Sequence, residues 1–125
     1  DLMHTGADNP TITAEAPWIE VVAGISRGGL GAVNVVDETG HLFGIITDGD
    51  LRRALQQIKH AELETLKSAE IMTGNPVVAS PELLAYDALR LMEDRPSQIS
   101  VLPVVDGERL CIGLIRLHDI VRSGL

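Results

Sequence analysis

The sequence is poor in cysteine, in aromatic residues and in positive charge, and each shortage argues against a class of protein or compartment. Its single cysteine, Cys111, cannot form an intramolecular disulfide, so we expect a reducing, cytoplasmic location. One Trp, one Tyr and one Phe are too few for an aromatic platform that stacks single-stranded nucleic acid. The formal net charge of −8, from 10 Lys and Arg against 18 Asp and Glu, argues against nucleic acid or an acidic membrane surface as a partner.

Long apolar runs, metal-binding patterns and nucleophile motifs are also missing. No apolar stretch approaches the roughly 20 residues that span a membrane, and we expect no signal peptide. Because the first residue is Asp1 rather than Met, we expect an excised part of a longer protein. The spacing of Asp, His and Cys fits neither a zinc nor a calcium site, and no Ser or Cys stands in a nucleophile motif. We therefore expect no metal and no catalytic residue in this chain.

What the sequence does contain is an internal repeat. The triplet Val-Val-Asp at 35–37 returns at 104–106, and the same offset relates Gly44 to Gly113 (113 − 44 = 69). Two similar units that each expose an apolar face can bury those faces against one another. The seam between them is then a natural place for a ligand.

The repeat slips out of register once. Asn9-Pro10 matches Asn75-Pro76 at an offset of 66 instead of 69 (75 − 9 = 66). Small insertions of this kind are tolerated in loops and not in a core. We therefore predict loops at 5–8 and 94–98.

Apolar periodicity and turn residues predict the order βαββα in both copies. For the first copy we expect an extended segment at 11–13, a helix from Pro17 to about Arg27, strands at 32–36 and 42–47, and a helix at 51–59. For the second copy we expect an extended segment at 77–79, a helix opened by Ser80-Pro81, strands at 100–105 and 110–116, and a last helix beginning near His118.

These elements predict an α/β (α+β) fold in which two βαββα repeats pack by pseudo-two-fold symmetry. We place the first repeat at 1–59 and the second at 69–125. The polar, helix-compatible segment 60–68 between them is expected to be a linker, with Ser68 capping a short turn.

The first candidate site is the segment 44–51, where a strand ends in a polar turn and a helix opens. Such a junction collects free backbone N–H groups and the positive end of a helix dipole, which favours a phosphate or carboxylate. The Thr47 hydroxyl can donate to that anion, and the Asp50 carboxylate can accept both hydroxyls of a ribose. The alternative is purely structural, because Thr47 and Asp50 have the spacing of a capping box for the following helix.

The second copy keeps the acid at this position and changes its neighbours. Asp119 corresponds to Asp50, whereas Arg116 stands in place of Thr47 and His118 in place of Gly49. An Arg there can clamp an anion with two hydrogen bonds. His118 either donates to a phosphate or completes a local hydrogen bond with Asp119. The two clefts are therefore expected to differ.

The duplicated βαββα order, with the pattern G-h-h-T-x-x-D at a strand-to-helix junction, resembles a tandem pair of CBS domains, a Bateman module. The segments 1–6, 47–53 and 117–124 are similar to the C-terminal CBS pair of bacterial arabinose-5-phosphate isomerases. The resemblance covers essentially the whole chain.

The resemblance implies that this chain is not itself catalytic. In these enzymes an upstream sugar isomerase (SIS) domain would carry the isomerase chemistry, on the route to Kdo and lipopolysaccharide, and the CBS pair would regulate or assemble it. It further implies a homodimer or tetramer and a nucleotide ligand, for which we favour a cytidine nucleotide, CMP or CMP-Kdo, over AMP or ATP. The alternative is a structural dimerisation module that has no ligand.

The resemblance also implies which residues meet the ligand. Thr47 and Asp50 in the first copy and Asp119 in the second would contact phosphate or ribose. Backbone groups of Thr11 and of Val77-Val78, at the start of each copy's first strand, would contact the base. Arg116 departs from the Ser or Thr of the family pattern. The predicted ligand-binding residues are Thr11, Thr47, Asp48, Asp50, Val77, Val78, Arg116, His118 and Asp119.

Overall fold

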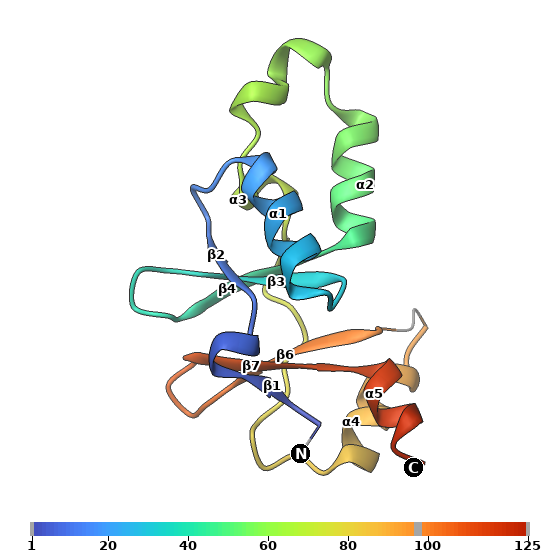
Figure 1. Ribbon diagram of the computed structural model, residues 1–125. Coiled ribbons are helices and arrows are strands. Elements are labelled where there is room, and N and C mark those ends of the chain that lie inside the picture. Colours follow the sequence, from blue (N-terminus) through green and yellow to red (C-terminus); the bar gives the residue numbers. More distant parts are fainter. Residues whose placement is uncertain (1, 97–98, 125) are drawn as a thin grey trace.

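The computed structural model describes residues 2–96 and 99–124, and it contains two β-sheets that lie one above the other between two groups of helices (Figure 1). The four-stranded sheet has the order β2 (Thr11–Thr13), β3 (Ala32–Val36), β4 (Leu42–Thr47), β5 (Thr73–Gly74). The three-stranded sheet has the order β1 (His4–Thr5), β7 (Cys111–Arg116), β6 (Val101–Val105). The predicted α/β fold of two repeats is confirmed.

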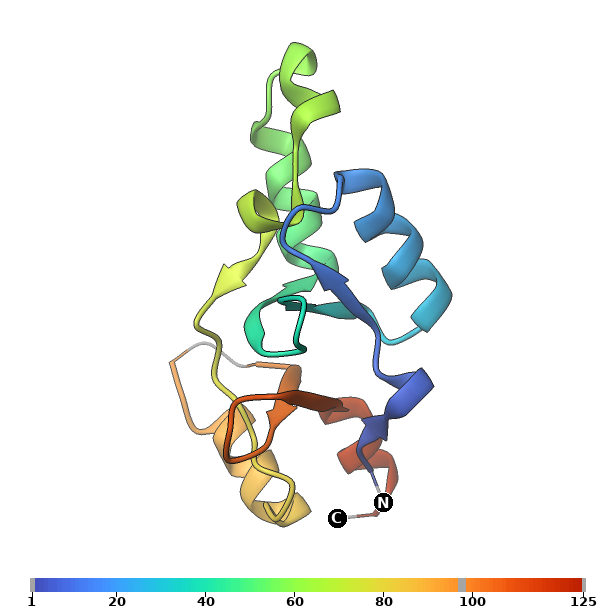
Figure 2. The ribbon, with the colours of Figure 1, turned by 90° about the vertical axis from the view of Figure 1, so that its left-hand side faces the viewer.

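The helices cover the outer side of each sheet (Figure 1). On the side of the four-stranded sheet lie α1 (Trp18–Gly28), α2 (Asp48–Gln57), the 3-10 turn η2 (His60–Thr65) and α3 (Ser68–Ile71). The second repeat carries α4 (Ala85–Glu93) and α5 (Leu117–Arg122), and the 3-10 turn η1 (Gly6–Asp8) follows β1. Both ends of the chain lie at the lower end of the molecule, as the view turned by 90° also shows (Figure 2).

Each repeat contributes its first strand to the sheet of the other repeat, and we call β1 and β5 the exchanged strands. Strand β1 pairs antiparallel with β7 of the second repeat, and β5 pairs antiparallel with β4 of the first. Glycines permit this close approach, because a Cβ at Gly44 would lie 2.6 Å from the Thr73 carbonyl oxygen. A Cβ at the equivalent Gly113 would lie 2.8 Å from the His4 carbonyl oxygen. The exchanged strands connect the two repeats at both ends of the seam.

The buried core consists of one cluster in each repeat and a third between them. The seam cluster contains Leu30, Ala32, Ile45, Val101 and Leu114. Two pairs in this cluster are equivalent positions of the two copies, since 101 − 32 and 114 − 45 both equal 69. The repeats thus bury the same sheet face against each other. This is the arrangement that pseudo-two-fold packing predicts.

Three predicted helix starts differ from the structure. Helix α2 begins at Asp48, not at 51, because its N-cap is Thr47. Helix α4 begins at Ala85, not at Ser80-Pro81, because the chain first makes a turn in which Leu83 N donates to Ser80 O and then extends at Leu84. Pro17 precedes α1 as its N-cap instead of forming its first residue.

Other segments also differ from their predictions. Of the predicted loop 5–8, Thr5 lies in β1 and the remainder forms η1. The extended segment 77–79 contributes only an isolated bridge from Ala79 to Val104. In the predicted loop 94–98, residues 97–98 lie outside the described residues.

The linker 60–68 contains a regular turn and a buried serine. It holds η2 and the start of α3, and Ser68 is buried with its hydroxyl donating to the Ala16 carbonyl at 3.0 Å. The cap is instead on Lys67, whose N–H donates to the Glu70 carboxylate at 3.0 Å. Exact repeat boundaries at 59 and 69 stay a prediction. Within 2–96 and 99–124, no helix combines the length and the apolar character needed to cross a membrane.

Candidate functional site

The first strand-to-helix junction is built as a capping box. Thr47 ends β4 in an extended conformation, and its hydroxyl oxygen accepts a hydrogen bond from Asp50 N at 3.2 Å. In return, the Asp50 carboxylate accepts from Thr47 N at 3.0 Å. Two backbone N–H groups at the start of α2 are satisfied in this way. The structural role proposed for this pair is therefore present in the fold.

Asp50 also receives hydrogen bonds from outside the capping box. Its Oδ1 accepts from the Thr73 hydroxyl at 3.2 Å and from Arg53 Nη2 at 2.7 Å. Thr73 comes from the exchanged strand β5, whereas Arg53 lies one turn further along α2. The side chain of Asp50 is 11% exposed and that of Arg53 65%. Asp50 is thus held by mostly neutral donors, with one cation reaching it from the solvent side.

A cavity of about 650 Å³ opens in front of Asp50, with residues of both repeats in its wall. This volume is in the usual range for small-molecule sites. Four of the predicted ligand residues line it, namely Thr47, Asp48, Asp50 and Val77. Its wall is mixed, because apolar side chains such as Ile45, Ile99 and Val101 accompany the charged ones. Such a wall can accept a flat apolar group at one part and a polar, charged group at another.

Sequence reasoning missed five further polar residues of this wall, which are Arg53, Thr73, Asn75, Arg95 and Ser100. The position of Arg53, one helical turn after Asp50, was a local signal that could have identified it. The other four come from segments distant from Asp50 in sequence, and only the folded chain brings them to the cavity.

The second junction holds its acid with charged partners. Arg116 ends β7, and its Nε and Nη2 donate to Oδ2 and Oδ1 of Asp119, each at 2.9 Å. Nε2 of His4, on the exchanged strand β1, donates to Oδ2 of Asp119 at 2.8 Å. The Arg116 guanidinium, with a smaller contribution from His4, lowers the pKa of Asp119 from 3.8 to about 2, although partial burial opposes the shift. Asp119 is therefore anionic throughout the neutral range.

The remaining predicted residues lie apart from the first cavity. Thr11 is exposed on β2, where it pairs in register with Asn34, and His118 is exposed in the first turn of α5. Val78 lines a different cavity of about 490 Å³ in the second repeat, together with Leu91. The structure thus groups four predicted residues, Asp50 among them, at the first cavity and two, Arg116 and Asp119, at the second junction. Among the described residues, no group of three or more His, Cys, Asp and Glu is placed to hold a metal ion.

Comparison with known proteins identifies the fold. The CBS domain model matches residues 1–57 and again residues 68–125. The chain belongs to the CBS domain family. Two solved CBS pairs show the same fold, each with a TM-score of 0.81. One is CBSX2 in complex with AMP, at 22% identity over 99% of this chain and 93% of that one. The other is the CBS pair of MJ0100 in complex with 5-methylthioadenosine and S-adenosyl-L-methionine, at 27% identity over 97% of this chain and 91% of that one.

The sequence relatives include enzymes named arabinose 5-phosphate isomerase KdsD. The chain is 38% identical to that of Yersinia pestis and 34% identical to that of Escherichia coli K12, in both cases over 125 residues and 100% of its length. It spans 37% of the length of each of these relatives, at their C-terminal end. The predicted resemblance to the CBS pair of these isomerases is confirmed. The role of each predicted ligand residue stays a prediction.

Proposed function

We propose that this CBS pair is the regulatory part of an arabinose-5-phosphate isomerase and binds a nucleotide in the cavity at Asp50. The relatives named KdsD support the first half of the proposal, since they match the entire chain at 34% to 38% identity. The chain spans 37% of their length, and in this proposal the isomerase reaction belongs to an upstream domain. The protein would then act in the cytoplasm on the route to Kdo and lipopolysaccharide, as a homodimer or tetramer.

The single observation that carries the second half is the cavity in front of the Asp50 carboxylate. A carboxylate that accepts two hydroxyls is a common way to hold a ribose. The Thr47 hydroxyl and the guanidinium groups of Arg53 and Arg95 also line the cavity and can donate to a phosphate. The apolar part of the wall, with Val77 next to it, suits the face of a base. Together these groups match the three parts of a nucleotide.

The base of the proposed nucleotide ligand is either adenine or cytosine. The two solved CBS pairs described above contain adenine ligands, which favours AMP or a related adenine compound. The position of the isomerase at the head of Kdo synthesis instead favours CMP or CMP-Kdo as a feedback signal. Both classes share ribose and phosphate, the groups that the Asp50 end of the cavity recognises.

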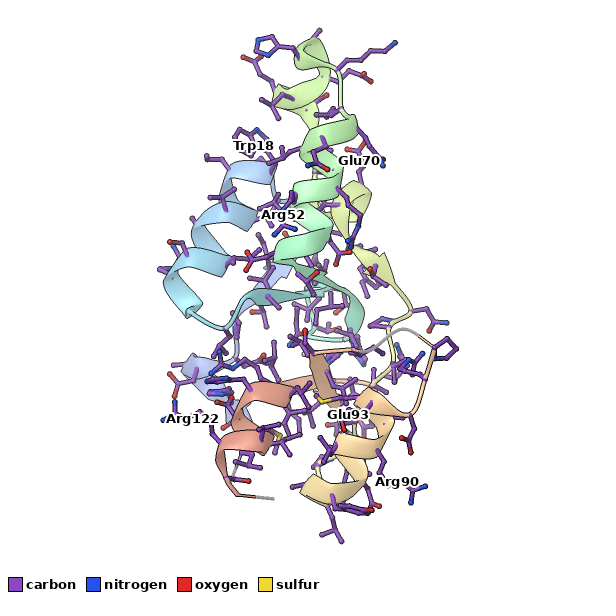
Figure 3. The ribbon with its side chains drawn as sticks, turned by 90° about the vertical axis from the view of Figure 1, so that its right-hand side faces the viewer. Trp18, Arg52, Glu70, Arg90, Glu93 and Arg122 are labelled. Atoms are coloured by element: carbon purple, nitrogen blue, oxygen red, sulfur yellow. The ribbon has the colours of Figure 1, made fainter. Side chains whose placement is uncertain are left out.

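A second candidate function, assembly without a ligand, is favoured by a different observation. Helices α4 and α5 contact one another, and large apolar side chains are exposed on and beside them. Tyr86 on α4 is 59% exposed, Val121 on α5 57%, and Leu84 at the N-cap of α4 70%. Charged residues on the same two helices, among them Arg90, Glu93 and Arg122, lie at this lower end of the molecule (Figure 3). Apolar groups rimmed by charge are common at surfaces where subunits associate.

A thermal-shift screen separates the two functions. The chain is tested against AMP, ADP, ATP, CMP, CTP and CMP-Kdo, because a ligand that binds only the folded state raises the melting temperature by mass action. We expect one class to raise it, and we expect Asp50→Ala to abolish that rise. Glu20→Ala is the matched control, since this exposed acid lies in the first turn of α1, away from the cavity. No shift with any compound at millimolar concentration would support assembly alone.

A further inference from the structure

We propose that the second cleft of this CBS pair takes no nucleotide, because Arg116 and His4 already occupy the carboxylate that would hold the ribose. The chain then binds one nucleotide, at Asp50. This inference rests on the proposed function and adds the number of ligands and the residues that determine it.

The two acids stand in equivalent frameworks. In both repeats the acid contacts the last residue of the strand that precedes its helix. It also contacts the first residue of the strand that the other repeat contributes to the sheet. The offset of 69 relates all three positions, since 119 − 50, 116 − 47 and 73 − 4 are equal. The equivalent pairs are Asp50 and Asp119, Thr47 and Arg116, and Thr73 and His4. The frameworks match, and only the chemistry of the two neighbours differs.

Arg116 offers Asp119 the same donor pattern that a ribose diol would offer. Its Nε and Nη2 reach one carboxylate oxygen each, both at 2.9 Å. Two adjacent hydroxyls of a ribose would approach the carboxylate in a similar fork. His4 Nε2 then adds a third hydrogen bond, at 2.8 Å to Oδ2. A diol would have to compete with a charged internal partner that already donates to both oxygens.

Displacement is harder at Asp119 than at Asp50. The side chains of Arg116 and Asp119 are 24% and 20% exposed, so separating them leaves two partly buried charges without partners. At Asp50 the cation is Arg53, which is 65% exposed and reaches a single oxygen. Exposed ion pairs of this kind contribute little, because water and salt screen them. The threonine hydroxyls beside Asp50 are uncharged and line the cavity, so they can turn toward a ligand.

The pair Arg116 and His4 therefore gives Asp119 a structural task in place of a binding task. His4 belongs to β1, so its hydrogen bond fixes the beginning of the chain against α5, 115 residues later. In this role Asp119 positions the exchanged strand.

The test restores the chemistry of the first cleft in the second. Isothermal titration calorimetry with AMP, and separately with CMP, counts the ligands bound per chain. We expect one ligand for the wild type and two for the double variant His4→Thr/Arg116→Thr. Adding Asp119→Ala to that variant should return the count to one. A wild-type count of two, or a double variant that folds and stays at one, would overturn the inference.

The reciprocal variant keeps the test decisive if the first one fails to fold. Thr47→Arg/Thr73→His places the partners of the second acid around Asp50 and leaves the second repeat unchanged. We expect its count to fall from one to zero, while the control Glu20→Ala, an exposed acid in the first turn of α1 away from the cavity, stays at one. Nucleotide binding by Thr47→Arg/Thr73→His would contradict the inference. A wild-type count of zero with both compounds contradicts the proposed function instead, so the two failures are distinguishable.

Discussion

The two repeats place an aspartate at the same junction and surround it with different partners. Asp50 is held by threonine hydroxyls and a backbone N–H, with one exposed arginine outside. Asp119 is held by the forked guanidinium of Arg116 and by the ring of His4. The difference supports our proposal that the duplicated fold retains its acid for two reasons. In that proposal Asp50, with mainly neutral partners, binds a ligand, and Asp119, with charged partners, has a structural role.

The closest approach of the exchanged strands provides the strongest test of the shared framework. Gly44→Ala and Gly113→Ala each place a methyl group against a backbone oxygen, at 2.6 Å and 2.8 Å, so a strand must move. Overpacking of this kind costs about 1–3 kcal/mol. We expect Gly44→Ala to be the worse of the two, since its nearest contacts, at 2.6 Å to the Thr73 oxygen and 2.7 Å to Met72, are shorter than the 2.8 Å contacts of Gly113 with His4 and Met3. Urea denaturation measures both losses. Gly107→Ala is the control, because a Cβ there meets nothing within 4 Å.

The pH dependence of stability should separate the second acid from the first. Because folding lowers the pKa of Asp119 from 3.8 to about 2, its contribution is present above the unfolded value and is lost as pH falls through the folded value. The shift corresponds to about 2 kcal/mol. We expect wild-type stability to fall more steeply than that of Asp119→Asn between about pH 5 and pH 2. Parallel curves would show that Arg116 and His4 do not stabilise the charged form.

The capping box at the first acid should have a smaller effect on stability than on binding. Removing the N-cap interaction with Asp50→Ala costs about 1 kcal/mol. Thr47→Ala should cost a similar amount, and the double variant should cost less than the sum of the two, because they remove one shared interaction. Chemical denaturation and calorimetric titration of the same samples measure the two effects. Strictly additive losses would mean that Thr47 and Asp50 act separately.

The smallest stability effect is expected at the exposed ion pair of the first repeat. Arg53→Ala should change the free energy of unfolding by less than about 1 kcal/mol, since its side chain is 65% exposed. It should weaken nucleotide binding more than nucleoside binding, because the guanidinium lines the cavity and can meet a phosphate. Titrations with CMP and cytidine, or AMP and adenosine, measure the difference. Equal losses for both members of a pair would assign Arg53 no phosphate contact.

Local patterns in the sequence predicted much of the fold. The strand runs 32–36 and 42–47 coincide with β3 and β4, because alternation and turn residues act over a few neighbours. The helix at Ser80-Pro81 was predicted too early, since these residues form a turn that resembles a helix start. Strands β1 and β5 were not predicted. At two residues each they carry no periodicity, and they form only where the other repeat's sheet offers a partner.

In the candidate site, too, contacts between residues close in sequence could be predicted and contacts between distant segments could not. Spacing alone predicted the pair Thr47 and Asp50, because residues three apart at a helix start are neighbours in any context. It identified Arg116 and Asp119 as candidate residues, but their contact with each other was not predicted. By itself, the sequence therefore determined the repeated framework and the two acids. Only the tertiary structure brought Thr73 to Asp50 and His4 to Asp119, since these contacts join segments 23 and 115 residues apart. Which acid lines the described cavity and which is held by charged partners depends in part on such distant neighbours, because burial and charge are properties of the folded surroundings.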